Sequence, residues 1–402
     1  MIESSSRARI KAVNTTRVQG LNTFTLTELF LCLAIIINLL YSLFYPVYTA
    51  LHGVYHIIIF VLTVLVFISE LRVKVNLSNT IILAVFIGLT VTAIIMNKSG
   101  LGLIVNILWP LTIIYIFKNS KLSPSYINKI NILMLSGWIV ASLATFTYNE
   151  QFFANFEAGI ESEGINPNTM AIIIVFTSLF VQLYIDSTSK SKLIKAAIYI
   201  VSFLALYRTR SRTSLIAFAL VLLMDFVAKK KILKNKKLGM IVPIFIIVAG
   251  VIFPFVYTML FTRGIVSYHT LFLGKRIFTG RQYIWLNLWE YLQQHKNALL
   301  WGVGYNTDLY SKGTFNLHNA YLSIFAQYGI TLFIFYIWYI IRSFSGIYNR
   351  MGHISDLQFK CYQILIYVLI VGFGEGVLSY LPNMIFIAMA IGIGNREKVE
   401  VA

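Results

Sequence analysis

Long apolar runs, separated by polar connections, repeat along the whole chain. Each run holds roughly 20 residues, the length with which an α-helix crosses the hydrocarbon core of a bilayer. The pattern predicts an all-α integral membrane protein, a polytopic bundle of about 12 transmembrane helices. The predicted helices are 26–47, 54–71, 80–96, 101–117, 130–148, 168–185, 194–208, 213–228, 239–262, 319–341, 361–381 and 383–394.

The composition agrees with a chain that lies mostly in a membrane. Of its 402 residues, 58% are hydrophobic and only 12% are charged, whereas a soluble domain carries about 25% charged residues. We therefore expect no separate soluble domain. Both cysteines, Cys32 and Cys361, lie inside apolar runs, where we expect small buried side chains and no disulfide.

Basic residues predict the orientation. The formal net charge is +18, and most of the 33 lysines and arginines fall on alternate connections, above all in the run KKKILKNKK at 229–237. Because cytoplasmic connections are enriched in Lys and Arg, both termini are predicted in the cytoplasm. Topology thus accounts for the charge, and we expect no nucleic-acid partner. Asp225 is predicted to pair with Lys229, four residues further along a helix.

This orientation divides the chain into five regions. They are a cytoplasmic segment (1–25), transmembrane helices 1–9 (26–262), an extracytoplasmic loop (263–318), transmembrane helices 10–12 (319–394) and a cytoplasmic tail (395–402). The long loop contains apolar residues at helical spacing, from Ile284 and Trp285 through Leu288 and Trp289 to Leu292. They predict an amphipathic helix on the outer membrane surface.

Arginines gather where positive-inside topology does not predict them. In YRTRSRTSL, Arg208, Arg210 and Arg212 lie at the outward end of one helix and the start of the next. A guanidinium group can bind phosphate through two parallel hydrogen bonds, so this cluster is a candidate site for a lipid-linked phosphate. The alternative is contact with lipid headgroups or with the acidic outward segment 149–168. Arg281, at the predicted start of the amphipathic helix, is a candidate anion-binding residue or an ordinary surface arginine.

Two further polar positions could carry chemistry. His318 and Asn319 stand where the long loop meets an apolar run, so His318 is a candidate general base. The alternative is a helix start with Asn319 as its N-cap. Glu375 lies among glycines in VGFGEGV, inside the predicted helix 361–381. A carboxylate at that depth needs a partner, and the outward arginines are natural ones, whether its role is catalytic or that of a counter-ion.

Other signatures of chemistry are missing from the sequence. It contains no phosphate-binding GxxxxGK[ST] motif, no DxD pair and no cluster with metal-ligand spacing, so we expect neither a cofactor nor a metal site. WGVG, with Gly302 and Gly304, lacks the strand and helix of a dinucleotide site and is predicted to form a turn.

The order of the short motifs resembles a known superfamily. SRTSL (211–215) is followed by TGRQYIW (279–285), WGVGYN (301–306) and HNAYLSIFAQYGI (318–330), with GINPN (164–168) ahead of them. This arrangement resembles the O-antigen ligase and O-antigen polymerase (Wzy-like) superfamily of bacterial surface-polysaccharide enzymes, which is similar to the GT-C class in fold.

The resemblance implies a glycosyltransferase in the cytoplasmic (inner) membrane of a bacterium, with its active site on the outer face. Its donor would be an undecaprenyl-diphosphate-linked oligosaccharide. Arg210, Arg212 and Arg281 match the residues that would hold the diphosphate, with Arg208 and Asn319 beside them, and His318 matches the residue that would activate the acceptor hydroxyl. Membrane lipid, a flippase and a chain-length regulator are the partners this implies.

Three functions fit these features. The amino-acid composition is rich in Ile, Lys and Asn and poor in Ala, as in proteins from low-GC genomes, which favours a Gram-positive source. Such a source has no lipid A, so the composition favours a polymerase of capsule, O-antigen or exopolysaccharide repeat units. A ligase that transfers the glycan to another acceptor would use the same donor chemistry. A flippase or exporter of the lipid-linked oligosaccharide would instead place charges along a path near the bilayer midplane.

Overall fold

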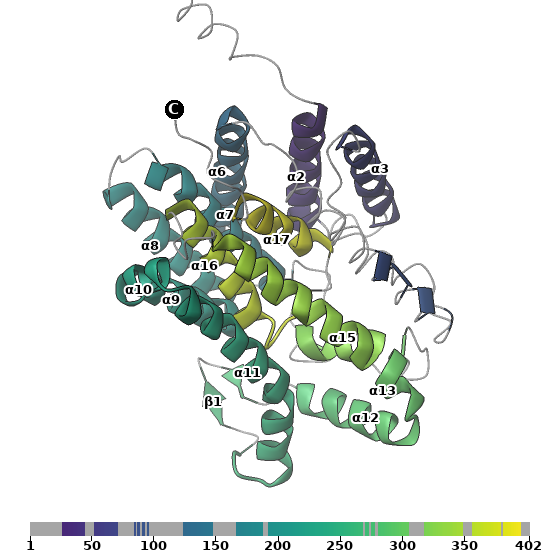
Figure 1. The fold of residues 1–402 in the computed structure, drawn as a ribbon. Helices are drawn as coiled ribbons and strands as arrows, with labels where there is room; N and C mark the ends of the chain where they lie inside the picture. The colour runs from purple at the N-terminus through teal and green to yellow at the C-terminus, as the bar shows by residue number, and fades with distance from the viewer. Residues whose placement is uncertain are drawn as a thin grey trace, which may run out of the picture.

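The computed structural model describes residues 26–44, 52–70, 124–147, 166–187, 192–267, 270–272, 275–277, 280–304, 317–348, 356–378 and 381–394, with isolated positions between 84 and 95. The predicted helix 101–117, most of 80–96 and of the acidic segment 149–168, the N-terminal segment and the tail lie outside these residues. Elsewhere the predicted helices are confirmed, mostly to within a few residues (Figure 1). The helices are α2 (Leu26–Phe44), α3 (His52–Glu70), α6 (Pro124–Thr147), α7 (Pro167–Ser187), α8 (Lys192–Thr209), α9 (Arg212–Val227), α10 (Lys229–Lys234), α11 (Lys236–Thr262), α12 (Arg281–Gln294), α13 (Asn297–Trp301), α15 (Ala320–Ile347), α16 (Asp356–Val371) and α17 (Leu381–Gly394).

The fold is that of a helical membrane protein. Helices α7, α16 and α17 form the centre of the bundle, and almost every described side chain along them is buried. The surrounding helices turn large apolar side chains outward, as at Phe226 and Phe245, which are 81% and 72% exposed. Helices α6, α11 and α15 include segments long and apolar enough to span a bilayer. Such an apolar exterior suits lipid and would be costly in water.

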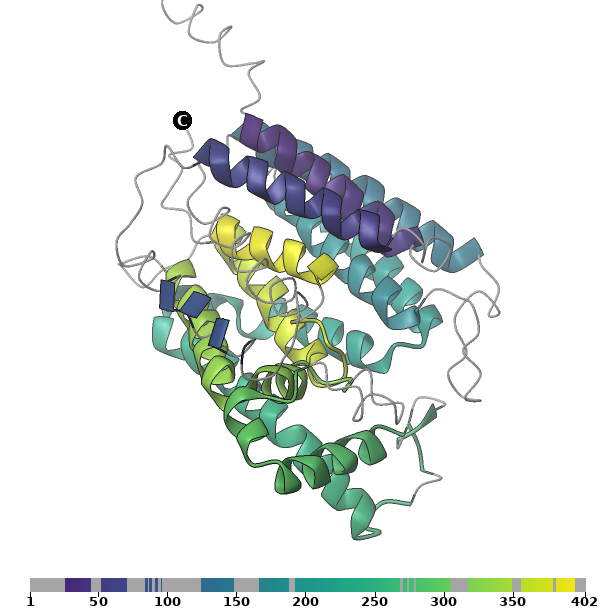
Figure 2. The ribbon, with the colours of Figure 1, turned by 90° about the vertical axis from the view of Figure 1, so that its right-hand side faces the viewer.

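The described part of the predicted long loop packs against α11 and α15. A two-residue antiparallel hairpin, β1 (Leu271–Phe272) with β2 (Lys275–Arg276), follows α11 and precedes α12 and α13 (Figures 1 and 2). Helix α12 is amphipathic as predicted, but its apolar face packs on α11. Trp285 lies edge-on to Phe253 and Tyr257, and Trp289 stacks on Phe255 at 4.3 Å between ring centroids. The protein itself therefore covers the apolar face of this helix, and its position on the outer membrane surface stays a prediction.

Helix α15 is interrupted near Gly329, and the WGVG turn forms hydrogen bonds to the backbone at this break. Gly329 has φ 75° and ψ 175°, which interrupts the helix. A break releases carbonyls of the preceding turn from helical hydrogen bonds, and those of Ala326 and Gln327 accept from the backbone N–H groups of Val303 (2.6 Å) and Gly304 (3.1 Å). The predicted turn is thus confirmed, and it fixes the first half of α15 against α13.

Substituting Gly329 with Ala should destabilise the protein by more than the backbone strain alone. That strain is about 1–3 kcal/mol, and the added Cβ would also lie 2.2 Å from the carbonyl oxygen of Leu300. Gly264→Ala is the matched control, because Gly264 also has positive φ (63°) but its Cβ would meet open space. Thermal unfolding in detergent should show a clearly larger loss for Gly329→Ala. Equal losses would contradict this account of the turn.

Asp225 does not pair with Lys229. It accepts hydrogen bonds from Lys360 of α16 and, at 2.8 Å, from the hydroxyl of Tyr199 of α8, with Lys195 3.9 Å away. Lys229 instead pairs with Asp356 at 2.7 Å. The prediction was wrong because the fully buried Lys360 needs a counter-ion more than an accessible lysine does. The ion pair links three helices at the end of the bundle that carries the lysine run.

Candidate functional site

Three side chains that were singled out separately in the sequence meet at the opposite end of the bundle. Arg281, His318 and Glu375 come from the start of α12, the residue pair before α15 and the turn after α16. The starts of α7 and α9 reach the same place.

Glu375 is the centre of the group. Its side chain is only 10% exposed. The carboxylate oxygen Oε1 accepts hydrogen bonds from Nη2 of Arg281 at 3.1 Å and from Nδ2 of Asn168 at 2.7 Å. Its other oxygen, Oε2, lies 4.0 Å from Nδ1 of His318. The expectation that an arginine pairs with Glu375 is confirmed, and the partner is Arg281, not the cluster at 208–212.

Glu375 was placed inside a helix by the sequence, and that was wrong. Helix α16 ends at Val371, and Glu375 lies in the turn that follows. The glycines around it favour a turn over a helix. Gly374 is also required by close approach, since a Cβ there would lie 2.7 Å from the hydroxyl oxygen of Thr213 and 3.0 Å from Nη1 of Arg281.

Arg281 is positioned by the packing of α12. Trp285, Leu288 and Leu292 are buried against α11 and its neighbours. Residues four apart lie on the same face of a helix, so burial of Trp285 also turns Arg281 inward. Its side chain stays 22% exposed. Because Glu375 is bonded to Nη2, the guanidinium keeps other N–H groups with which it can bind an anion.

Hydrogen bonds to its two chain neighbours, Leu317 and Asn319, fix the backbone at His318. The indole N–H of Trp285 donates to the carbonyl of Leu317 at 2.7 Å. On the other side, the Asn319 amide donates to the carbonyls of Phe373 (3.1 Å) and Gly250 (3.4 Å). His318 itself has φ 47°, a left-handed conformation that non-glycine residues adopt at a cost of about 1–3 kcal/mol and that is concentrated at functional sites. Its side chain is 34% exposed and therefore accessible to a substrate.

Asn319 is the N-cap of α15, the structural alternative to a substrate-binding role. Its side-chain oxygen accepts from the backbone N–H of Leu322 at 2.7 Å, which makes it the N-cap of α15. The residue is fully buried, and its amide is used by backbone carbonyls. Asn319 thus joins α15 to α11 and to the Glu375 turn, and positions His318 without reaching a substrate.

The other three arginines line the turn between α8 and α9. Arg208 and Arg210 are exposed, and Arg212, the first residue of α9, is half-buried. Arg210 has φ 56°, so the turn is strained there as well. Thr213 and Arg281 both lie close to Gly374, which places the start of α9 beside the site. The structure brings this turn next to Glu375 but shows no direct contact between the described atoms of these three arginines and the carboxylate.

Asn168 is a site residue that sequence reasoning missed. It lies in the first turn of α7, where Asn166 accepts from the backbone N–H of Asn168 at 2.9 Å and Pro167 is the first helical residue. Proline is favoured at that position because its missing N–H has no helical partner there. The GINPN stretch was noted only as part of the family resemblance. Nothing in the sequence indicated that its second Asn would reach a carboxylate more than 200 positions away.

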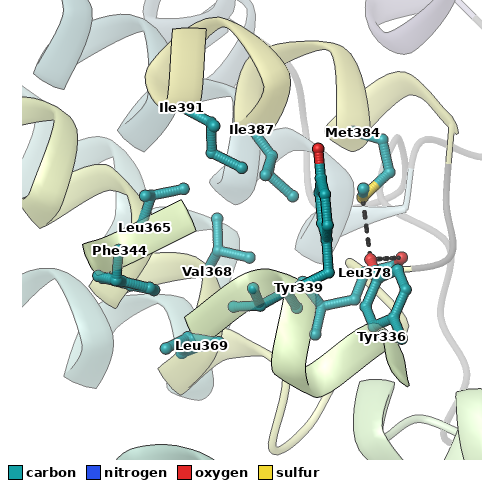
Figure 3. Close-up of a pocket in the computed structure, with 11 residues that line it drawn as sticks. Tyr336, Tyr339, Phe344, Leu365, Val368, Leu369, Leu378, Met384, Ile387 and Ile391 are labelled. Carbon is teal, nitrogen blue, oxygen red and sulfur yellow. Dashed lines mark hydrogen bonds between the residues drawn. The ribbon is translucent and has the colours of Figure 1, made fainter. Parts of the chain in front are cut away.

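A cavity lies between α15, α16 and α17 (Figure 3). It holds about 20 Å³ and is lined by apolar side chains such as Leu365, Leu369 and Ile387, with Tyr336 at one edge. The hydroxyl of Tyr336 donates to the carbonyl of Leu378 at 2.8 Å. No charged residue of the described chain lines it, so it does not fit a sugar or a diphosphate.

Comparison with known proteins finds a family match over part of the chain. Residues 197–337 match the O-antigen ligase family. This match confirms the predicted resemblance to the O-antigen ligase and polymerase superfamily. The matched segment extends from α8 into α15 and includes the arginine turn, Arg281 and His318. It supports a glycosyltransferase-like activity in surface-polysaccharide assembly. Asn168 and Glu375 lie outside the segment. None of the curated proteins matches the chain.

Proposed function

We propose that the protein polymerises undecaprenyl-diphosphate-linked oligosaccharide repeat units at the outer face of the cytoplasmic membrane. The observation that carries this proposal is the convergence of Arg281 and His318 on Glu375, at 3.1 and 4.0 Å, beside the arginine turn. A cation for a diphosphate and an imidazole for a hydroxyl are the two groups that such a transfer needs. The family match supports the class of reaction.

The reaction can be written with this chain's own residues. The acceptor hydroxyl attacks the anomeric carbon of the donor sugar, and the new C–O bond forms as the bond from that carbon to the diphosphate oxygen breaks. The electron pair of the broken bond leaves with undecaprenyl diphosphate, and the imidazole of His318 takes the hydroxyl proton. Arg281 and the arginine turn stabilise the charge on the leaving group. Attack from the side opposite the leaving group inverts the anomeric configuration.

The decisive experiment uses the purified protein in vesicles with one synthetic lipid-linked repeat unit, in the presence of EDTA and without ATP. A ladder of products differing by one repeat unit supports the polymerase. A single transfer to an added acceptor, without a ladder, would instead show a ligase. Movement of the intact donor across the bilayer without a new glycosidic bond would show a flippase.

Substituting Arg281 with Lys should lower kcat/KM about 10- to 100-fold. Lysine keeps the charge but lacks the planar set of donors, so it cannot bond Glu375 and a phosphate in the same way. The expected factor corresponds to losing a hydrogen bond to a charged group, about 1.5–3 kcal/mol. Arg263→Lys, at an exposed position just after α11, is the matched control and should retain wild-type kinetics. Comparable kinetics for both variants would remove Arg281 from the site.

A further inference from the structure

Asn168 and Arg281 share one oxygen of the Glu375 carboxylate. Asn168 donates to Oε1 from the α7 side, and Arg281 donates to the same atom from α12. The other oxygen is the one that lies nearest to His318 Nδ1. The two donors therefore fix which way the carboxylate faces.

The orientation of the Glu375 carboxylate determines which ring nitrogen of His318 carries the proton. A carboxylate beside Nδ1 favours the tautomer with the proton on that nitrogen, and Nε2 is then the basic nitrogen. The 4.0 Å separation is longer than a hydrogen bond, and contacts of this kind in catalytic sites shorten when the substrate binds.

We infer that Asn168 is a positioning residue, which holds Glu375 so that its second oxygen faces His318 and sets Nε2 of the imidazole as the base. Without the Asn168 amide, Arg281 can take both carboxylate oxygens in a bidentate pair, and the carboxylate turns away from His318. The inference deepens the proposed function and rests on it for the catalytic consequence, but not for the geometry.

Asn168→Ala and Asn168→Leu, which is close in size and uncharged, both remove the donor without adding a charge beside Glu375. We expect kcat to fall about 10- to 100-fold with little change in KM for donor or acceptor, because the substrate contacts remain and only the base is misplaced. Asn166→Ala is the matched control. It removes the cap of the same helix start but no contact to Glu375, so a purely structural role for Asn168 predicts the same loss in all three variants.

A measurement independent of turnover reads the tautomer directly. The chain contains six histidines, and ¹⁵N NMR of histidine-labelled protein in nanodiscs can assign His318 by comparison with a His318→Asn variant. In the wild type and in Asn166→Ala we expect the Nδ1-protonated form to dominate. In Asn168→Ala and Asn168→Leu we expect its population to fall toward that of an exposed histidine.

The two readouts separate failure of this inference from failure of the proposed function. If the wild type forms no glycosidic bond, the proposed function fails, and the NMR comparison still decides whether Asn168 sets the tautomer. An unchanged tautomer in both Asn168 variants would overturn the inference. So would losses of kcat in these variants no larger than that in Asn166→Ala.

Discussion

Replacing His318 with Asn is expected to reduce glycosyl transfer about 10²–10⁴-fold, the usual contribution of a positioned general base. Asn is the sharper substitution because it tolerates the left-handed backbone at this position, φ 47°, better than Ala does. The variant should therefore still fold and insert. In cells, lipid-linked repeat units should accumulate while polymer is lost, which gel analysis of extracted polysaccharide and lipid would measure.

His295→Asn provides the control for the His318 experiment. His295 is exposed at the end of α12, where it stacks on Tyr291 far along the helix from Arg281. It should produce polymer at the wild-type level. If His318→Asn also produced polymer of normal amount and length, His318 could not be the base, and Arg281 with Glu375 would be left as a purely electrostatic site.

Asp225→Asn should lower the free energy of unfolding by about 3–5 kcal/mol, because it leaves the fully buried Lys360 without its counter-ion. Thermal unfolding in detergent, followed by tryptophan fluorescence, measures the loss. Asp356→Asn is the matched control, since its carboxylate is 61% exposed in its pair with Lys229. It should cost no more than about 1 kcal/mol.

A double variant tests the cause of the loss at Asp225. Asp225→Asn combined with Lys360→Met removes both charges, and replacing a buried pair by uncharged groups is often neutral. We expect stability to recover toward the wild type. A double variant no more stable than Asp225→Asn alone would mean that the ion pair is not what Asp225 contributes.

Hydrophobic periodicity predicted most of the described helices, because a transmembrane helix is determined by a local run of apolar residues. It did not predict how far α16 extends. The predicted helix 361–381 continued through Glu375, whereas the structure ends the helix at Val371 and puts the carboxylate in a turn. The glycines flanking Glu375 were visible in the sequence. The hydrogen bonds that the carboxylate forms with Arg281 and Asn168 once the helix has ended were not.

Pairing between distant segments was the part that sequence reasoning could not supply. Helical spacing marked the apolar face of α12, yet it did not say whether lipid or α11 covers that face. Likewise, Asp225 was assigned to Lys229 on local spacing, while Lys360 of α16 is its partner. Arg281 was singled out as a basic residue at a predicted helix start, and His318 and Glu375 as ionisable residues beside or inside apolar runs. Asn168 was missed because an Asn near a helix start has an ordinary explanation.

The most direct test of the central claim is release of the leaving group. Purified protein in nanodiscs is incubated with a synthetic undecaprenyl-diphosphate-linked repeat unit and EDTA, and free undecaprenyl diphosphate is quantified together with new glycosidic bonds. We predict equal amounts of the two from the wild type, and about 10²–10⁴-fold less of both from His318→Asn. Bond formation without release of the diphosphate lipid, or equal release from His318→Asn, would contradict the account.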